Sequence, residues 1–132
     1  AAKHTSSTIV AKSISAGDGI TTYRGLVKVL HAAEESKVSV ACDALLLDEV
    51  SVSNTYPTMQ ISTSEVDMAH EARVGRIGEE ELFYLRSRGF STERAMQMIV
   101  SGFVEPIVKS LPLEYAVELN KLILLEMEGS VG

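Results

Sequence analysis

The fold of this chain is decided by the stretch Ser39-Val40-Ala41-Cys42-Asp43-Ala44-Leu45-Leu46-Leu47. Val40, Cys42 and Ala44 occupy alternate positions in it, and alternation places them on one face of a strand. Residues 44–47 are apolar without interruption, which is typical of a strand that is covered on both faces. We therefore predict a buried strand here, with Cys42 on one of its faces.

Further strands are predicted on both sides of this stretch, within residues 1–77. β-Branched and apolar residues mark the segments 8–14, 23–29, 59–61 and 66–69, and Gly17-Asp18-Gly19 supplies a turn between the first two. Strands that return at such short intervals fit a sandwich, a barrel or a β-solenoid. The sequence contains no clean repeat, so the pattern leaves these three architectures open.

Helical spacing replaces the strand pattern over residues 78–132, which we expect to form a helical domain after the strands of residues 1–77. Glu79-Glu80-Glu81 places negative charge in a first turn, where the helix dipole favours it. Ser91 is the predicted N-cap of a second helix, which Gly102 and Pro106 should kink or end. The region is thus predicted to consist of short helices in succession.

A third helix should follow Pro112, because proline suits the first turn of a helix. Apolar residues occur on more than one of its faces. The main stripe is Leu113, Ala116, Val117, Leu124 and Met127, while Leu119, Leu122 and Leu125 fall outside it. We expect one face to pack on a core and another to be free for a partner.

The composition excludes several classes of function. The 132 residues carry a net charge of −6, which argues against a nucleic-acid surface. No apolar run approaches the ~18 residues that would indicate a membrane span. The start resembles no secretory signal, so we expect a cytoplasmic location. Because the chain begins without methionine and enters a strand at once, we also expect it to be part of a longer protein.

Cys42 is the only cysteine, and this limits the chemistry of the chain. One thiol forms no internal disulfide and completes no four-cysteine metal site, so any further ligands must be other residue types or come from another subunit. Alternation also fits a buried thiol that acts as a small hydrophobe. Nearby Asp43 should raise the pKa of the thiol, which makes a cysteine hydrolase a weak alternative.

A second polar group, Met68-Ala69-His70-Glu71-Ala72, lies where the strands give way to helices. Adjacent residues on a strand point to opposite faces, so His70 and Glu71 should not address one target. His70 should share a face with Val66 and Met68. On the pattern alone, a hydrogen-bonded histidine beside a solvated acid is the favoured interpretation, and a site formed by these residues is the alternative.

Several segments together resemble the C-terminal part of SufB-type scaffold subunits, which belong to the SufB/SufD family of the SUF iron–sulfur cluster assembly system. The segments are Ser15-Ala16-Gly17, Tyr23-Arg24-Gly25-Leu26-Val27-Lys28, Cys42-Asp43-Ala44-Leu45-Leu46, Thr55-Tyr56-Pro57, His70-Glu71-Ala72, Gly78-Glu79-Glu80-Glu81-Leu82-Phe83-Tyr84-Leu85, Gly102-Phe103-Val104-Glu105-Pro106, Leu113-Glu114-Tyr115-Ala116-Val117-Glu118-Leu119 and Glu128-Gly129-Ser130-Val131-Gly132. SufD-type sequences tend to carry His-Gly where this chain has His70-Glu71, so the resemblance favours the SufB type. Ala69 and Arg73 depart from the commoner family residues, Glu and Thr.

The resemblance implies a right-handed parallel β-helix, of which residues 1–77 are the last rungs, followed by the helical domain. It implies a non-enzymatic scaffold that works in a complex with a SufC-type ATPase, docked by the C-terminal helices, and with SufD or a second SufB through the β-helix. Cys42, with Glu71 and His70, would be candidate ligands of a transient iron–sulfur cluster or of sulfide, and Cys42 and Glu71 candidate iron ligands.

For the isolated chain two further expectations follow. It should hold no stable cluster, because one thiol is too few. It should also self-associate, because an uncovered rung of a solenoid exposes backbone groups that recruit other strands. The alternative function is a structural β-solenoid and helix interaction module, in which Cys42 belongs to the core and has no ligand role.

Overall fold

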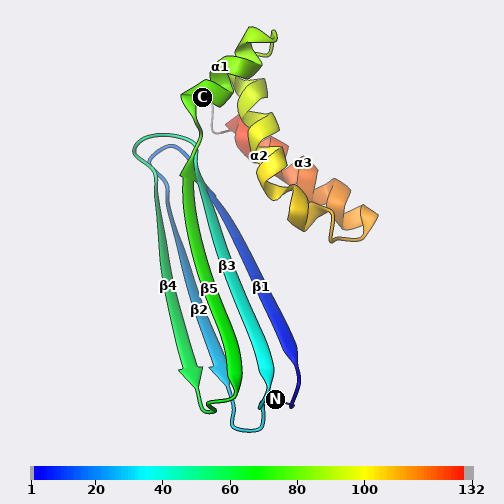
Figure 1. Cartoon of the computed structure of the whole chain (residues 1–132). Coiled ribbons are helices and arrows are strands. Elements are labelled where there is room, and N and C mark those ends of the chain that lie inside the picture. The colour runs from blue at the N-terminus through cyan, green and yellow to red at the C-terminus, as the bar shows by residue number, and fades with distance from the viewer. Residues whose placement is uncertain (1, 130–132) are drawn as a thin grey trace.

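The computed structural model describes residues 2–129 and consists there of parallel strands followed by helices (Figure 1). The strands are β1 (Ser6–Ser15), β2 (Ile20–Val29), β3 (Ser36–Leu46), β4 (Val52–Ile61) and β5 (Val66–Arg76). The helices are α1 (Glu79–Ser87), α2 (Thr92–Val108) and α3 (Leu113–Gly129). The expected change from strands to helices is confirmed.

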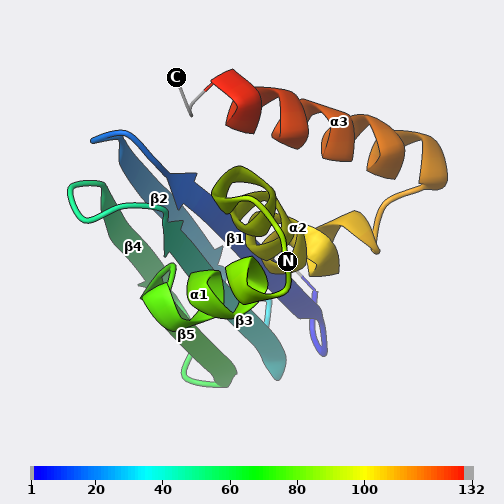
Figure 2. The ribbon, with the colours of Figure 1, turned by 90° about the horizontal axis from the view of Figure 1, so that it is seen from above.

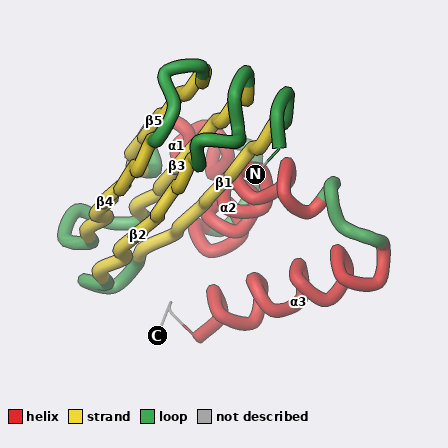
Figure 3. Tube along the Cα trace, turned by 90° about the horizontal axis from the view of Figure 1, so that it is seen from below, coloured by secondary structure: helices red, strands yellow, loops and turns green. Residues whose placement is uncertain are grey.

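The strands alternate between two sheets, which face each other as two layers (Figure 3). Sheet A contains β1, β3 and β5 in that order, sheet B contains β2 and β4, and all pairs are parallel. The chain therefore winds as a coil, and contacts between successive turns, such as Lys12 with Asp43, join residues 31 positions apart. This arrangement is the expected end of a parallel β-helix, and it decides among the three architectures that the sequence left open.

The turn at Gly17-Asp18-Gly19 lies between β1 and β2, as predicted. Gly17 and Asp18 adopt positive φ angles of 59° and 61°, a conformation that costs glycine little and that aspartate tolerates. The Asp48 carboxylate, on the next turn of the coil, accepts a hydrogen bond from the Gly17 N–H at 2.6 Å. The stacked turns thus add a hydrogen bond to the strand ladders that set the register between coils.

Four strands are longer than the segments predicted from the sequence, and β4 and β5 differ most. β4 begins at Val52 rather than at residue 59, and it passes through Pro57. β4 has a paired strand on one side only, and edge strands accommodate proline because one side of the ladder is not needed. β5 continues to Arg76, although its second half is exposed and charged.

The helices begin where the sequence indicated. The Ser91 side chain accepts a hydrogen bond from the Arg94 N–H at 3.2 Å, which confirms it as the N-cap of α2. α2 continues through Gly102 and ends at Val108, soon after Pro106, whose ring therefore disturbs only the last turn. Among residues 2–129, none of the helices is both long enough and apolar enough to cross a membrane.

The core lies between the outer face of sheet A and the helices (Figure 2). Leu45 of β3 and Ile77 pack there with Val100 of α2 and Met127 of α3. The other face of β3 is also buried, so the prediction that residues 44–47 are covered on both sides is confirmed for Ala44, Leu45 and Leu46. Lys12 adds a polar link, because its Nζ lies 4.3 Å from the centre of the Phe103 ring and 2.9 Å from Asp43 Oδ2.

The packed face of α3 differs from the predicted stripe. Met127 is buried and Ile123 packs beside it, but Leu113 and Val117, which the stripe includes, are exposed. The exposed apolar residues of α3 are Leu113, Tyr115, Val117, Leu122 and Leu125. The residues of α3 that pack on the core, Ile123 and Met127, lie in its last turns. The first turns of α3 therefore do not need a buried apolar face.

We expect Ser91→Ala to lower the free energy of unfolding by about 1 kcal/mol, because the substitution removes the N-cap acceptor of α2. Urea unfolding followed by circular dichroism measures the loss. Ser101→Ala, at an exposed position inside the same helix, is the matched control and should have no such cost. Equal losses for the two variants would contradict the capping role.

Candidate functional site

Cys42 lies on the inward face of sheet A, in its central strand β3. Only 5% of the residue is exposed, and it shares this face with the buried residues Val40 and Ala44. Its register neighbours on β1 and β5 are Ala11 and Ala72. Two small neighbours leave space around the sulfur, which borders a cavity of about 210 Å³ between the sheets.

His70 is the nearest candidate ligand to Cys42. Its Nε2 atom lies 3.8 Å from Cys42 Sγ, a distance that fits a weak hydrogen bond to sulfur. His70 pairs in register with Val40, so it reaches the sulfur diagonally across the β3–β5 ladder. The predicted alternation is confirmed, since Val66, Met68 and His70 are half-buried while Glu71 is exposed.

Glu71 lies on the outer face of β5 and does not approach Cys42. Its Oε1 accepts hydrogen bonds from Arg73 Nε at 2.9 Å and from Arg73 Nη2 at 2.7 Å. Arg73 stands in register with Asp43, and Asp43 with Lys12, so Glu71 belongs to a charged row on that face. Within residues 2–129, no three His, Cys, Asp or Glu side chains are arranged to hold a metal ion.

The surroundings of Cys42 keep its sulfur in the thiol form. Burial raises the pKa of the Cys42 thiol, and the negative charge of Asp43 raises it further, as the sequence predicted. A hydrogen bond from the Tyr23 side chain has the opposite effect on this pKa. A soft sulfur of this kind becomes a thiolate when it binds a thiophilic metal such as iron, since the metal displaces the proton.

Tyr23 is the residue of this site that sequence reasoning missed. It comes from β2 of the opposite sheet and lines the cavity with Cys42, together with the hydroxyl residues Ser13, Thr21 and Thr55. The strand pattern placed Tyr23 in a strand but contained no signal that this strand would face Cys42. That contact depends on how the turns set one sheet over the other.

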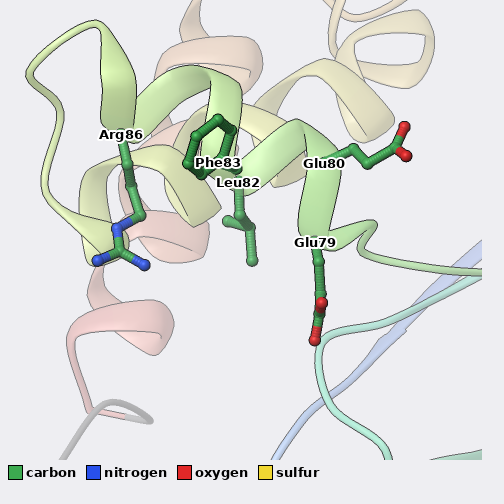
Figure 4. A pocket seen from close by; sticks show the side chains of 5 residues that line it. All are labelled: Glu79, Glu80, Leu82, Phe83 and Arg86. Atoms are coloured by element: carbon green, nitrogen blue, oxygen red, sulfur yellow. The ribbon is translucent and has the colours of Figure 1, made fainter.

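A larger hollow of about 590 Å³ lies elsewhere, on α1. Figure 4 shows its lining residues, with Glu79, Leu82 and Arg86 pointing to one side of the helix. Phe83 is largely exposed beside them. The lining of this hollow contains no thiol, imidazole or hydroxyl side chain, whereas the smaller cavity is lined by Cys42.

Comparison with known proteins places the amino-acid sequence in a family. Residues 1–103 match the family model described as the SUF system FeS cluster assembly SufBD core domain. The chain is 57% identical over 131 residues to an iron–sulfur cluster assembly SufBD family protein of Mycobacterium tuberculosis, covering 99% of this chain and 16% of that protein. It is 52% identical over 131 residues to the iron–sulfur cluster assembly protein SufB of Bacillus subtilis, again over 99% of this chain and 28% of that protein.

A SufBD family protein of Staphylococcus aureus is 50% identical, over 99% of this chain and 28% of its own length. The chain thus spans between 16% and 28% of the length of these relatives. The matched residues include β1 to β5, Cys42 and His70. On this evidence the chain belongs to the SufBD family of the SUF iron–sulfur cluster assembly system.

Proposed function

We propose that this chain is the part of an assembly scaffold on which Cys42 and His70 hold iron or sulfide while a cluster is built. The observation that carries the proposal is the 3.8 Å contact between Cys42 Sγ and His70 Nε2 on the inward face of sheet A. Thiolate and imidazole are both iron ligands in known iron–sulfur centres. The cluster is the cargo of this site, which acts as a platform and performs no catalytic turnover.

A cluster needs more ligands than one thiol and one imidazole. β5, which carries His70, has a paired strand on one side only in the described part of the chain. A second subunit of the same family, SufD or another SufB, would therefore be able to approach this edge and contribute the missing ligands. We propose a site shared between two β-helices, and the raised pKa of Cys42 supports a thiol that stays protonated until metal arrives.

We assign Glu71 a secondary place in this proposal. Its carboxylate faces outward and is held by Arg73, so it would have to release that partner and act from the outer edge of β5. A hard carboxylate can hold incoming iron before the softer sulfur takes it. Cys42 and His70 therefore form the primary pair, and Glu71 would contribute only in the assembled complex.

The helices are proposed to dock the ATPase subunit. The support is the row of exposed apolar side chains on α3 and the exposed Phe83 and Tyr84 on α1, which exceed what the core requires. A single free cysteine is typical of proteins of the reducing cytoplasm, and we propose that location. In the alternative function, a structural interaction module, these helices would act and Cys42 would only fill the interior.

Comparing His70→Ala with Glu71→Ala in the intact complex tests the ranking of the ligands. We expect His70→Ala to lower cluster retention by about tenfold or more, because the loss of a proposed ligand should cost at least as much as the loss of an outer partner of a ligand. Glu71→Ala should lower it much less, because Glu71 does not contact Cys42. Iron and acid-labile sulfide are measured after reconstitution and gel filtration.

The control for this comparison is Asp67→Ala, an exposed position on the same outer face of β5 as Glu71. It should retain the cluster as the unchanged protein does. Full retention in His70→Ala would refute the proposed pair and favour the structural module. A larger loss in Glu71→Ala than in His70→Ala would reverse the ranking and move the site to the outer face.

A further inference from the structure

Tyr23 reaches Cys42 from the opposite sheet. It lies in β2, where it lines the 210 Å³ cavity together with Cys42. Its side chain lowers the pKa of the Cys42 thiol, so the phenol of sheet B acts on the sulfur of sheet A across the interior of the coil. The sulfur is thus contacted by the imidazole of His70 from β5 at 3.8 Å and shares its cavity with the phenol of Tyr23 from β2.

Gly25 provides the space in which the Tyr23 ring lies. A Cβ atom at position 25 would come within 2.4 Å of the Tyr23 hydroxyl oxygen and within 2.8 Å of the ring carbons Cε1 and Cζ. Gly25 does not have a positive φ angle, so its backbone conformation does not require glycine. Glycine is needed here for room, because the phenol lies along β2, over the position of the missing side chain.

We propose that Tyr23 is a positioning residue for Cys42, placed by the absence of a side chain at Gly25, and that its hydroxyl donates a hydrogen bond that holds the sulfur at the cavity beside His70. The effect of Tyr23 on a cluster rests on the proposed ligand role of Cys42. The positions of Tyr23, Gly25 and Cys42 do not depend on that role. Hydrogen bonds to the sulfur ligands influence the stability and potential of iron–sulfur clusters. Tyr23 would thus set both the direction of the sulfur and the strength with which it holds iron.

The rotamer of Cys42 reports the positioning directly. Since Cys42 is the only cysteine of the chain, labelling with ¹³C-cysteine gives a single set of NMR signals in the 132-residue protein. We expect one χ1 rotamer in the unchanged chain and averaged Hα–Hβ couplings in Tyr23→Phe, which loses only the hydroxyl. Gly25→Ala should produce the same averaging, although it removes no polar atom, because it displaces the phenol.

Two matched controls separate positioning from general damage. Tyr56→Phe removes a hydroxyl from the neighbouring strand, at a residue that is 54% exposed and faces Arg24 on the outside. Gly75→Ala adds a methyl group to a strand glycine that has nothing within 4 Å of the new Cβ. Both variants should keep the Cys42 couplings of the unchanged chain.

Cluster retention in the intact complex supplies the functional measurement. We expect Tyr23→Phe and Gly25→Ala to lose a reconstituted cluster to a chelator about tenfold faster than the unchanged protein, as is typical for outer partners of metal ligands. Unchanged couplings in both variants would overturn the positioning role, whatever the cluster does. A different outcome is averaged couplings in both variants together with no cluster in the complex of the unchanged protein. That outcome would uphold the positioning role of Tyr23 and count against the proposed function.

Discussion

Replacing Cys42 with serine is expected to abolish cluster formation in the intact complex and to leave the assembly of the subunits unchanged. Cys42 is the only thiol in the chain, so no other sulfur here can take its place. A hydroxyl is a hard ligand and a poor substitute for thiolate toward iron. The fold should tolerate the change, because serine has nearly the same shape and the cavity already contains the hydroxyl groups of Ser13, Thr21 and Tyr23.

Iron and sulfide content after reconstitution measures this result, with gel filtration to show that the complex is intact. Ala44→Ser is the matched control, since it adds the same hydroxyl to the next inward position of β3 and keeps the thiol. That control should assemble a cluster. Equal iron and sulfide in Cys42→Ser and the unchanged protein would refute the ligand role and leave Cys42 as a residue of the interior.

Substituting Leu122 and Leu125 together with aspartate is expected to lower the affinity for the ATPase subunit at least about tenfold, which corresponds to about 1.4 kcal/mol of binding free energy. The two side chains are 56% and 63% exposed and lie one turn apart on α3, so they form one apolar strip. Charge on this strip should oppose docking and leave the core at Val100 intact. Isothermal calorimetry measures the affinity.

The control places the same charges on Leu26 and Val52, which are exposed and belong to sheet B, whereas the helices pack on Leu45 of sheet A. This variant should bind the ATPase normally. Ending the chain at Gly78 should also abolish binding, but it would uncover Leu45 and is the less specific test. Undiminished binding after the α3 substitutions would place the docking surface elsewhere.

The sequence predicted those features of the fold that depend on a few neighbouring residues. The turn at Gly17-Asp18-Gly19 and the Ser91 cap follow from local backbone chemistry. The burial of Leu45 and Leu46 on both faces follows from an unbroken apolar run. The length of β4 could not be predicted in this way. Pro57 and the polar residues before it form a strand because β2, on the preceding turn of the coil, pairs with them.

For the candidate site, the sequence likewise predicted the features that depend on neighbouring residues and missed the contacts between strands. Alternation indicated that Cys42 faces the interior and that His70 and Glu71 point apart. The contact between Cys42 and His70 depends on the register of β5 against β3, and the contact with Tyr23 depends on the stacking of the two sheets. Neither register leaves a local trace in the sequence, since the turns of the coil contain no repeated motif.

The central position of β3 governs how the site moves. Among the described strands only β3 has a hydrogen-bonded neighbour on each side, whereas β5 is paired along one edge. Local opening begins where fewest bonds must break, so β5 frays at a lower free energy than β3. We therefore expect the sulfur of Cys42 to be the stationary member of the pair, with excursions of the edge strand making and breaking its contact with His70.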